Sequence, residues 1–306
     1  MKKAIIVLIS IFVKGLVLGQ QMPVSDNYFM EKSTLSSSYT GHSDPGSFFT
    51  SFRSDWTGIV GGPRTLRLFY SDLITTNAGI GGKIIYDKSG IFNQIYFMGT
   101  YSYKLKITEK HKVLMALSAG FYHNRLNFTD YYDDPKYNID PVMISQDIPS
   151  KLKFMTDFSA LYNYEGFYAG IMFANINFGD MKYSEVDVSY KPLANYLIHA
   201  SYSIPVNQRW DISPLIYLRG GKYIRNQIGV AAMMRYQKNI YISLSFRDPG
   251  IWGFGFGTNI SRGIRLYYTF NISSTISARV YNNHEISLGI GIKELIKKPL
   301  PVDAVE

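Results

Sequence analysis

The chain has 306 residues, a formal net charge of +9, 25 tyrosines and no cysteine. The lack of cysteine excludes disulfides, thiolate metal sites and cysteine nucleophiles, and the length suits one closed β-barrel as well as two soluble domains. Aromatic residues make up 15% of the chain and charged residues only 18%, which is typical of strands that meet lipid at an interfacial belt. Lys and Arg are scattered, so we expect anionic lipid or lipopolysaccharide head groups as partners of the basic surface, and no nucleic acid.

Residues 1–19 have the pattern of a secretory signal peptide. Lys2 and Lys3 form a positive start, an apolar run follows, and the small residue Gly19 ends a short exit segment. Lys14 interrupts the apolar run and leaves it too short to span a bilayer as a helix. The pattern predicts export and cleavage near Gly19.

Residues 20–46 are polar and rich in serine, and they have no strand period. We expect this segment either to enter a barrel lumen or to lie in the periplasm. Residues 293–306 follow the last predicted strand and are expected to form a short periplasmic tail, so that both chain ends are periplasmic.

Residues 47–292 carry an almost continuous period-2 pattern, which predicts about fourteen strands. In the last strand, for example, Ile286 and Leu288 alternate with Glu285 and Ser287. The predicted strands are 47–54, 64–71, 78–87, 91–104, 112–125, 153–163, 166–174, 196–204, 210–219, 227–237, 240–247, 252–259, 264–271 and 284–292.

Alternation alone is equally compatible with a soluble β-sandwich. The lengths of the links between the predicted strands distinguish a barrel from a sandwich. Long links near 126–152, 175–195 and 272–283 fall on the side that also carries the corner after Phe52, and the other side has short turns. Bacterial outer-membrane barrels have this asymmetry, with short periplasmic turns and longer extracellular loops. The sequence therefore predicts an all-β transmembrane antiparallel barrel in the bacterial outer membrane.

The corner itself combines an aromatic ring, two guanidinium groups and turn-forming residues. Glycine tolerates positive φ and proline fixes its own φ, so this composition predicts a sharp hairpin top that displays the ring and both guanidinium groups. It either closes and anchors the barrel rim or contacts a partner directly. The candidate residues are Arg53, Trp56, Gly58, Gly61, Pro63 and Arg64.

Four charged residues fall on the polar face of predicted strands: Lys83, Asp157, Arg265 and Glu285. We expect them to pair and hold the lumen together; a pore lining is the alternative. Gly253, Gly255 and Gly257 resemble a nucleotide-binding loop only superficially, because they alternate as in a strand and no helix follows. They are expected on the lumen face.

The sequence offers little support for catalysis. The five histidines are dispersed without metal-ligand spacing, so we expect no metal, no cofactor and no enzyme activity. His123 and Asp157 could form part of a hydrolase site only if the fold brought them together. The acidic loop containing Asp130, Asp133, Asp134 and Asp140 could bind calcium, but its spacing is not that of an EF-hand, and a solvated loop is the expected state.

The segment F-R-S-D-W-T-G-I-V-G-G-P-R-T resembles the signature hairpin of the PorP/SprF family of Bacteroidetes outer-membrane proteins. Further similar segments are 28–30 with 38–41, 79–82 with 87–90, 117–120 and 283–288. Asp55 and Gly62 stand where the family usually has Gln and Ala.

The resemblance implies a component of the type IX secretion system. It also implies a large secreted partner with a C-terminal sorting domain, such as a gliding-motility adhesin, that is docked or attached at the surface with other secretion components. An outer-membrane transporter or porin for small molecules is the alternative.

Overall fold

The computed structural model describes residues 25–57, 59, 61–128, 147–177, 194–221, 224–274 and 282–296. Fourteen long strands form a closed antiparallel barrel, and β6 and β10 are short additions to it. The strands are β1 (Ser47–Asp55), β2 (Arg64–Leu73), β3 (Ala78–Ser89), β4 (Phe92–Lys106), β5 (His111–Asn127), β6 (Asp147–Pro149), β7 (Lys153–Tyr164), β8 (Phe167–Asn177), β9 (Asn195–Tyr202), β10 (Ile204–Pro205), β11 (Trp210–Gly221), β12 (Ile224–Tyr236), β13 (Ile240–Arg247), β14 (Ile251–Ser261), β15 (Ile264–Ser273) and β16 (Asn282–Gly291).

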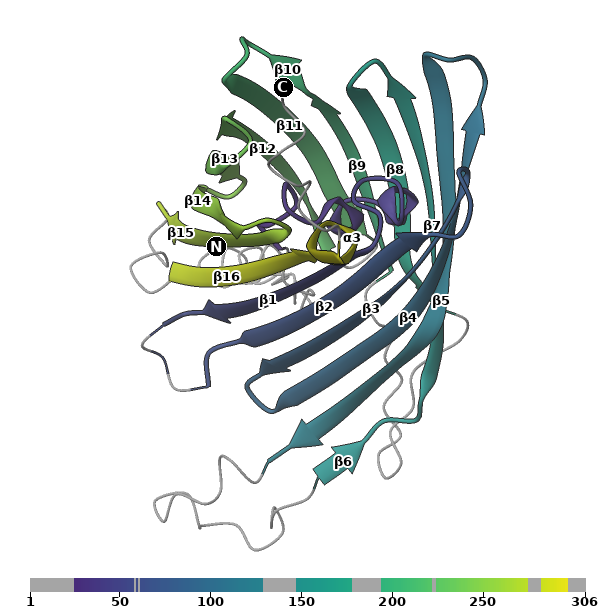
Figure 1. Cartoon of the computed structure of the whole chain (residues 1–306). Coiled ribbons are helices and arrows are strands. Elements are labelled where there is room, and N and C mark those ends of the chain that lie inside the picture. Colours follow the sequence, from purple (N-terminus) through teal and green to yellow (C-terminus); the bar gives the residue numbers. More distant parts are fainter. Residues whose placement is uncertain are drawn as a thin grey trace, which may run out of the picture.

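The ring closes where the first and last strands pair, and in one other place a long strand pairs past a short one. β1 pairs with β16, with Arg53 opposite Glu285, and β11 pairs with β9 around the short β10 (Figure 1). Every other long strand pairs with its long neighbours along the chain. The predicted barrel of about fourteen strands is confirmed. Within the described ranges, no helix is both long and apolar enough to cross a bilayer.

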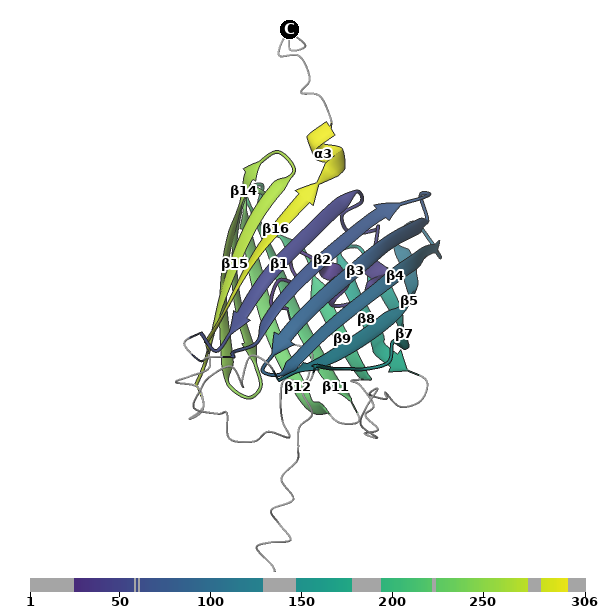
Figure 2. The ribbon, with the colours of Figure 1, turned by 90° about the horizontal axis from the view of Figure 1, so that it is seen from below.

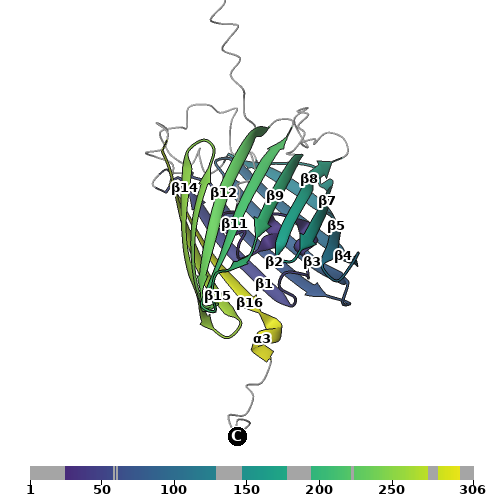
Figure 3. The ribbon, with the colours of Figure 1, turned by 90° about the horizontal axis from the view of Figure 1, so that it is seen from above.

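The two ends of the barrel differ. One end, which we call the loop end, carries the β1–β2 hairpin and the ends of β5 and β8 from which the two longest links leave. The opposite end, the short-turn end, carries tight turns such as Glu165–Gly166 between β7 and β8, and the helix α3 (Ile292–Ile296) that follows β16 (Figures 2 and 3). In an outer-membrane barrel the short-turn end is periplasmic and the loop end extracellular.

Each strand has an apolar outer face and a more polar inner face. Phe254 and Phe256 are half exposed on the outside, while Gly253, Gly255 and Gly257 between and beside them face the lumen. The placement of these glycines on the lumen face agrees with the prediction. Tyr267 of β15 explains Gly255 and Gly257, since a Cβ at position 255 would lie 2.1 Å from its hydroxyl oxygen and one at position 257 would lie 2.4 Å from its ring.

Residues 25–46, here called the plug, lie inside the barrel (Figure 1). The plug contains two short 3₁₀ helices, η1 (Lys32–Thr34) and η2 (Ser37–Tyr39). Its apolar side chains Tyr28, Leu35 and Tyr39 are buried in a cluster with wall residues of several strands. Burial of a side chain such as Leu35 contributes roughly 1.5–3 kcal/mol, so the plug is part of the hydrophobic core rather than a loose insertion.

Candidate functional site

The plug runs along the lumen from the loop end to the short-turn end. Its first described residue, Ser25, donates a hydrogen bond to Glu285 near the loop end (2.9 Å), and Gly46 bonds the carbonyl of Ser71 at the other end (2.9 Å). The segment thus occupies the lumen, one of its two predicted places. Ser25 lies in the loop-end half of the lumen, and the residues before it lie outside the described ranges.

A buried charge cluster joins the plug to the wall beneath the signature hairpin. Arg53 is 1% exposed, and its guanidinium contacts Asp26 of the plug (2.5 Å), Asp55 (3.0 Å) and Glu285 (3.5 Å). Arg67 of β2 adds a second cation on Glu285 at 3.2 Å. Three carboxylates and the surrounding arginines therefore neutralise one another in a part of the lumen closed to solvent.

Asp26 is the central acid of this cluster. Its carboxylate also accepts hydrogen bonds from Arg247 of β13 and Asn271 of β15, each at 2.6 Å. Burial alone would raise the pKa of Asp26, but Arg247 and Arg53 outweigh burial and hold that pKa below its ordinary value. Asp26 therefore stays ionised and ties one plug residue to strands from three parts of the wall.

The hairpin above the cluster is held by backbone hydrogen bonds. Trp56 has φ of +54°, and its N–H donates to the carbonyl of Asn282 at the start of β16 (2.8 Å). Gly61, with φ of +81°, accepts a hydrogen bond from the N–H of Gly90 in the next hairpin (3.2 Å). The indole of Trp56 remains 40% exposed. The corner thus presents an aromatic ring from a backbone fixed on both sides.

The signature residues do not act as one exposed group. Arg53 points into the lumen, so the expectation that the hairpin top displays its guanidinium is wrong: an odd-numbered position on β1 faces inward. Arg64 begins β2 on the opposite, exposed face, and Pro63 is partly buried. Gly58 lies outside the described residues.

The four lumen candidates all form ion pairs, but only two of them pair with each other. Lys83 of β3 contacts Asp157 of β7 over the inner faces of β4 and β5. Arg265 contacts Asp44 of the plug, and Glu285 belongs to the charge cluster. Each pair links two different segments, which is a structural role.

Near the short-turn end of the plug, its backbone contacts the backbone of the wall. Gly41 and Gly79 of β3 approach so closely that a Cβ on Gly79 would lie 2.5 Å from the carbonyl oxygen of Thr40. That oxygen accepts a hydrogen bond from Ser102 of β4 (2.7 Å), and Ser38 pairs with Ser159 of β7 (2.8 Å). Since β4 lies across the ring from β13, which holds Asp26, the plug bridges opposite walls.

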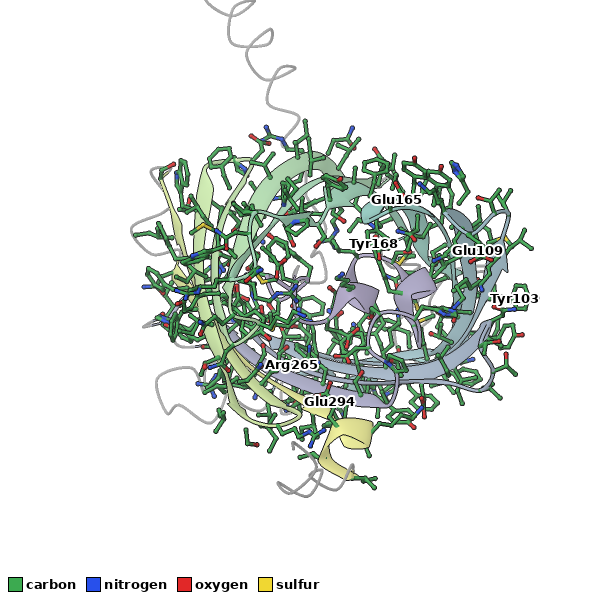
Figure 4. The ribbon with its side chains drawn as sticks, turned by 45° about the horizontal axis from the view of Figure 1, so that its top comes forward. Tyr103, Glu109, Glu165, Tyr168, Arg265 and Glu294 are labelled. Carbon is green, nitrogen blue, oxygen red and sulfur yellow. The ribbon has the colours of Figure 1, made fainter. Side chains whose placement is uncertain are left out.

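Among the described residues, at least two cavities lie between the plug and the wall. The loop-end cavity, about 100 Å³, is lined by Arg67, Lys83 and Arg219 together with apolar residues. The short-turn cavity, about 220 Å³, lies between the plug and wall residues from β8 to β15, and its lining includes Lys32, Tyr168 and Arg265. Figure 4 labels Tyr168 and Arg265 in a view toward the short-turn end, with the plug visible inside the ring.

The structure separates the two residues that the sequence offered for a hydrolase site. His123 lies on the outer face of β5 whereas Asp157 faces the lumen, so the two do not come together. Across the described ranges, no group of three acidic or histidine residues could hold a metal ion. The acidic loop with Asp130, Asp133, Asp134 and Asp140 lies outside them.

The charge cluster also contains residues that were not predicted as site residues from the sequence: Asp26, Arg67, Arg247 and Asn271. The inward faces of the strands carrying Arg67, Arg247 and Asn271 were readable from the alternation, so a census of charged inward positions could have found the two arginines. Asp26 has no such signal, because the segment around it has no period.

Several solved outer-membrane proteins resemble the barrel. The Acinetobacter baumannii outer membrane protein Omp33 is 9% identical with a TM-score of 0.48, covering 80% of this chain and 97% of its own. A Pseudomonas aeruginosa FadL homologue is 8% identical with a TM-score of 0.49 (88% and 98% covered), and the Ralstonia pickettii toluene transporter TbuX is 11% identical with a TM-score of 0.46 (89% and 94% covered). At these values the similarity does not extend to function.

No curated protein sequence matches the chain significantly. Residues 17–290, however, match the family described as "Type IX secretion system membrane protein PorP/SprF". The matched region contains the signature hairpin, the charge cluster and nearly the whole barrel. The chain is therefore an outer-membrane component of the type IX secretion system and belongs to the PorP/SprF family.

Proposed function

We propose that this barrel docks a large secreted protein that carries a C-terminal sorting domain, such as an adhesin, and supports its attachment at the cell surface. The signature hairpin and the long loops form the docking end. The other type IX secretion components deliver the partner, and an N-terminal signal peptide directs the barrel itself to the outer membrane.

The observation that carries the proposal is the exposed indole of Trp56 on a fixed backbone. Trp56 is 40% exposed, while the strand beneath it is anchored by the Arg53 cluster and its own N–H is bonded to β16. A rigid aromatic side chain loses little conformational entropy on binding and is a frequent anchor of protein interfaces. Arg64 beside it adds a cation that can bind a partner carboxylate.

The plug argues against the transporter alternative. It forms hydrogen bonds to opposite walls of the barrel and ion pairs at both of its ends. A porin needs a continuous water-filled path, whereas a docking barrel needs a sealed lumen and a stable rim. The apolar outer face requires outer-membrane lipid in either case, and exposed basic residues at the loop end suit lipopolysaccharide.

The test is an affinity pull-down of the tagged protein from detergent-solubilised outer membranes of its own host, with the recovered chains identified by mass spectrometry. We expect one large surface protein with a C-terminal sorting domain. The double variant Trp56→Ala/Arg64→Ala should lose it.

A matched control is Trp252→Ala/Arg225→Ala. Trp252 is 41% exposed and the Arg225 side chain 61% exposed, at the same end of the barrel but away from the signature hairpin. The control should retain the partner. Equal recovery from both double variants would remove the hairpin from the docking site, and recovery of the barrel alone from the unaltered protein would contradict docking.

A further inference from the structure

The short-turn cavity has a lysine at its wall without an ion-pair partner among the described residues. The Nζ of Lys32 lies over two tyrosine rings, 5.8 Å from the centre of Tyr39 and 5.3 Å from that of Tyr168. In contrast, the two arginines of this cavity are already paired: Arg235 contacts Asp211 at 2.9 Å, and Arg265 contacts Asp44.

Among the residues that line this cavity, Lys32 is therefore the cation without an acid at ion-pair distance. Burial lowers the pKa of Lys32, Arg235 lowers it further, and Asp44 only partly opposes them. A cation–π contact offsets some of this cost but does not neutralise the charge. An entering anion would gain a charge-assisted hydrogen bond from an ammonium group that the fold already holds in place.

The remaining lining fits the rest of a small organic acid. Tyr28, Phe29 and Tyr241 supply aromatic surface, and Ser201 and Ser213 supply hydroxyl groups. The volume is about 220 Å³, whereas a cavity of about 150 Å³ accepts benzene in another protein. The space suits a carboxylate on a chain of two or three carbon atoms, and it excludes a folded domain.

We propose that the short-turn cavity is a carboxylate-binding site that opens toward the periplasm, with Lys32 as its charged anchor and Tyr168 as a wall of the subsite. The carboxylate is either the side chain of an acidic residue on a periplasmic polypeptide or a free dicarboxylic acid. The site is independent of docking at the loop end, because it lies at the opposite end of the barrel.

The test uses the purified full-length protein in detergent and fluorescence anisotropy. The probes are a fluorescein-labelled, terminally blocked Ser-Glu-Ser peptide and its Ser-Gln-Ser counterpart, with glutarate as an unlabelled competitor. We expect the Glu peptide to bind at least about tenfold more tightly than the Gln peptide, since the two differ in one charge. Lys32→Met should lose at least about tenfold in affinity, because methionine keeps the apolar stem without the ammonium group.

Lys110→Met is the matched control. Lys110 is exposed at the same end and pairs with Glu165 at 2.7 Å, so its loss should leave binding unchanged. Tyr168→Leu, which alters the wall and not the plug, should weaken binding severalfold and provides an independent test if Lys32→Met fails to fold.

Glutarate that displaces the peptide at an equal or lower concentration assigns the site to a free acid, and failure to displace it assigns the site to a polypeptide. Equal binding of the two peptides, full binding by Lys32→Met, or no binding of either the peptide or glutarate would overturn the inference.

Discussion

Gly79 of β3 and Gly41 of the plug allow two backbones to touch inside the barrel. Gly41 has φ of +74°, and a Cβ there would lie 2.4 Å from the carbonyl oxygen of Asp72. Both glycines belong to segments that resemble family motifs, and the structure gives those motifs a joint physical purpose. They seat the plug against the wall.

Gly79→Ala should therefore loosen the plug. Its Cβ would meet the Thr40 carbonyl oxygen at 2.5 Å and the Ser102 hydroxyl at 2.6 Å, so the backbone must shift. Overpacking of this kind lowers the free energy of unfolding by about 1–3 kcal/mol. We expect faster hydrogen exchange in residues 36–42, measured by mass spectrometry. Gly99→Ala on the adjacent strand is the control, because a Cβ there has nothing within 4 Å; equal exchange in both variants would contradict this prediction.

Arg53→Met should be strongly destabilising. It would leave Asp26, Asp55 and Glu285 together with less positive charge to neutralise them, and breaking a buried ion pair in this way costs about 3–5 kcal/mol. The free energy of unfolding in urea and detergent is the measurement. Arg225→Met breaks an exposed pair with Asp248 (3.2 Å) and should cost less than about 1 kcal/mol. A similar cost for both would mean that the cluster does not support the fold.

At the level of single residues, the sequence could predict orientation but not partners. The period-2 pattern placed Lys83, Asp157, Arg265 and Glu285 on the inner face, where the structure has them. It could not predict that Arg265 pairs with Asp44, because pairing across a lumen depends on the path of a segment with no period. Arg53 was expected to be displayed because it was assigned to the hairpin corner, whereas β1 continues to Asp55 and its alternation turns Arg53 inward.

The plug as an element should respond to pH through His42. Burial, reinforced by Lys104, lowers the pKa of His42 to about 4 from an ordinary value of 6.5, so the docked plug holds this ring neutral where a released plug would protonate it. The contribution of neutral His42 to holding the plug in the lumen is complete above pH 6.5. It is lost progressively as the pH falls from 6.5 toward 4.

We therefore expect plug residues to exchange amide hydrogen faster at pH 5 than at pH 7.5, after correction for the intrinsic rates. His42→Gln should remove the part of this difference that histidine causes. If His42→Gln and the unaltered protein show the same pH dependence, then His42 is not the group responsible.

The strands were predictable as elements because each one alternates over eight or more residues. Their predicted ends differ from the structure by a few residues, as for 91–104 against β4 at Phe92–Lys106. β6 and β10 were missed, since segments of two or three residues carry no measurable period. The plug's location was left open for the same reason: a polar segment inside a polar lumen resembles a polar segment in water.

For the whole molecule, the orientation of the barrel can be tested with introduced cysteines, because the chain has none of its own. Ile59→Cys, at a position 45% exposed in the signature hairpin, should react with a membrane-impermeant maleimide on intact cells. Glu109→Cys, in the exposed turn after β4 at the short-turn end, should react only after the outer membrane is permeabilised. The reverse labelling pattern would mean that the barrel is inserted in the opposite orientation, with the signature hairpin in the periplasm.

The plug is covalently continuous with β1, and β1 closes the barrel by pairing with β16. A barrel that had already closed would have to admit the plug by threading, against the ion pairs and glycine contacts that line its path. It follows that the seam between first and last strands should form late, after the plug has been laid against the β2–β5 part of the wall. The N-terminal segment would then serve as an internal template during assembly, and its deletion should slow closure of the barrel more than it lowers the stability of barrels that have closed.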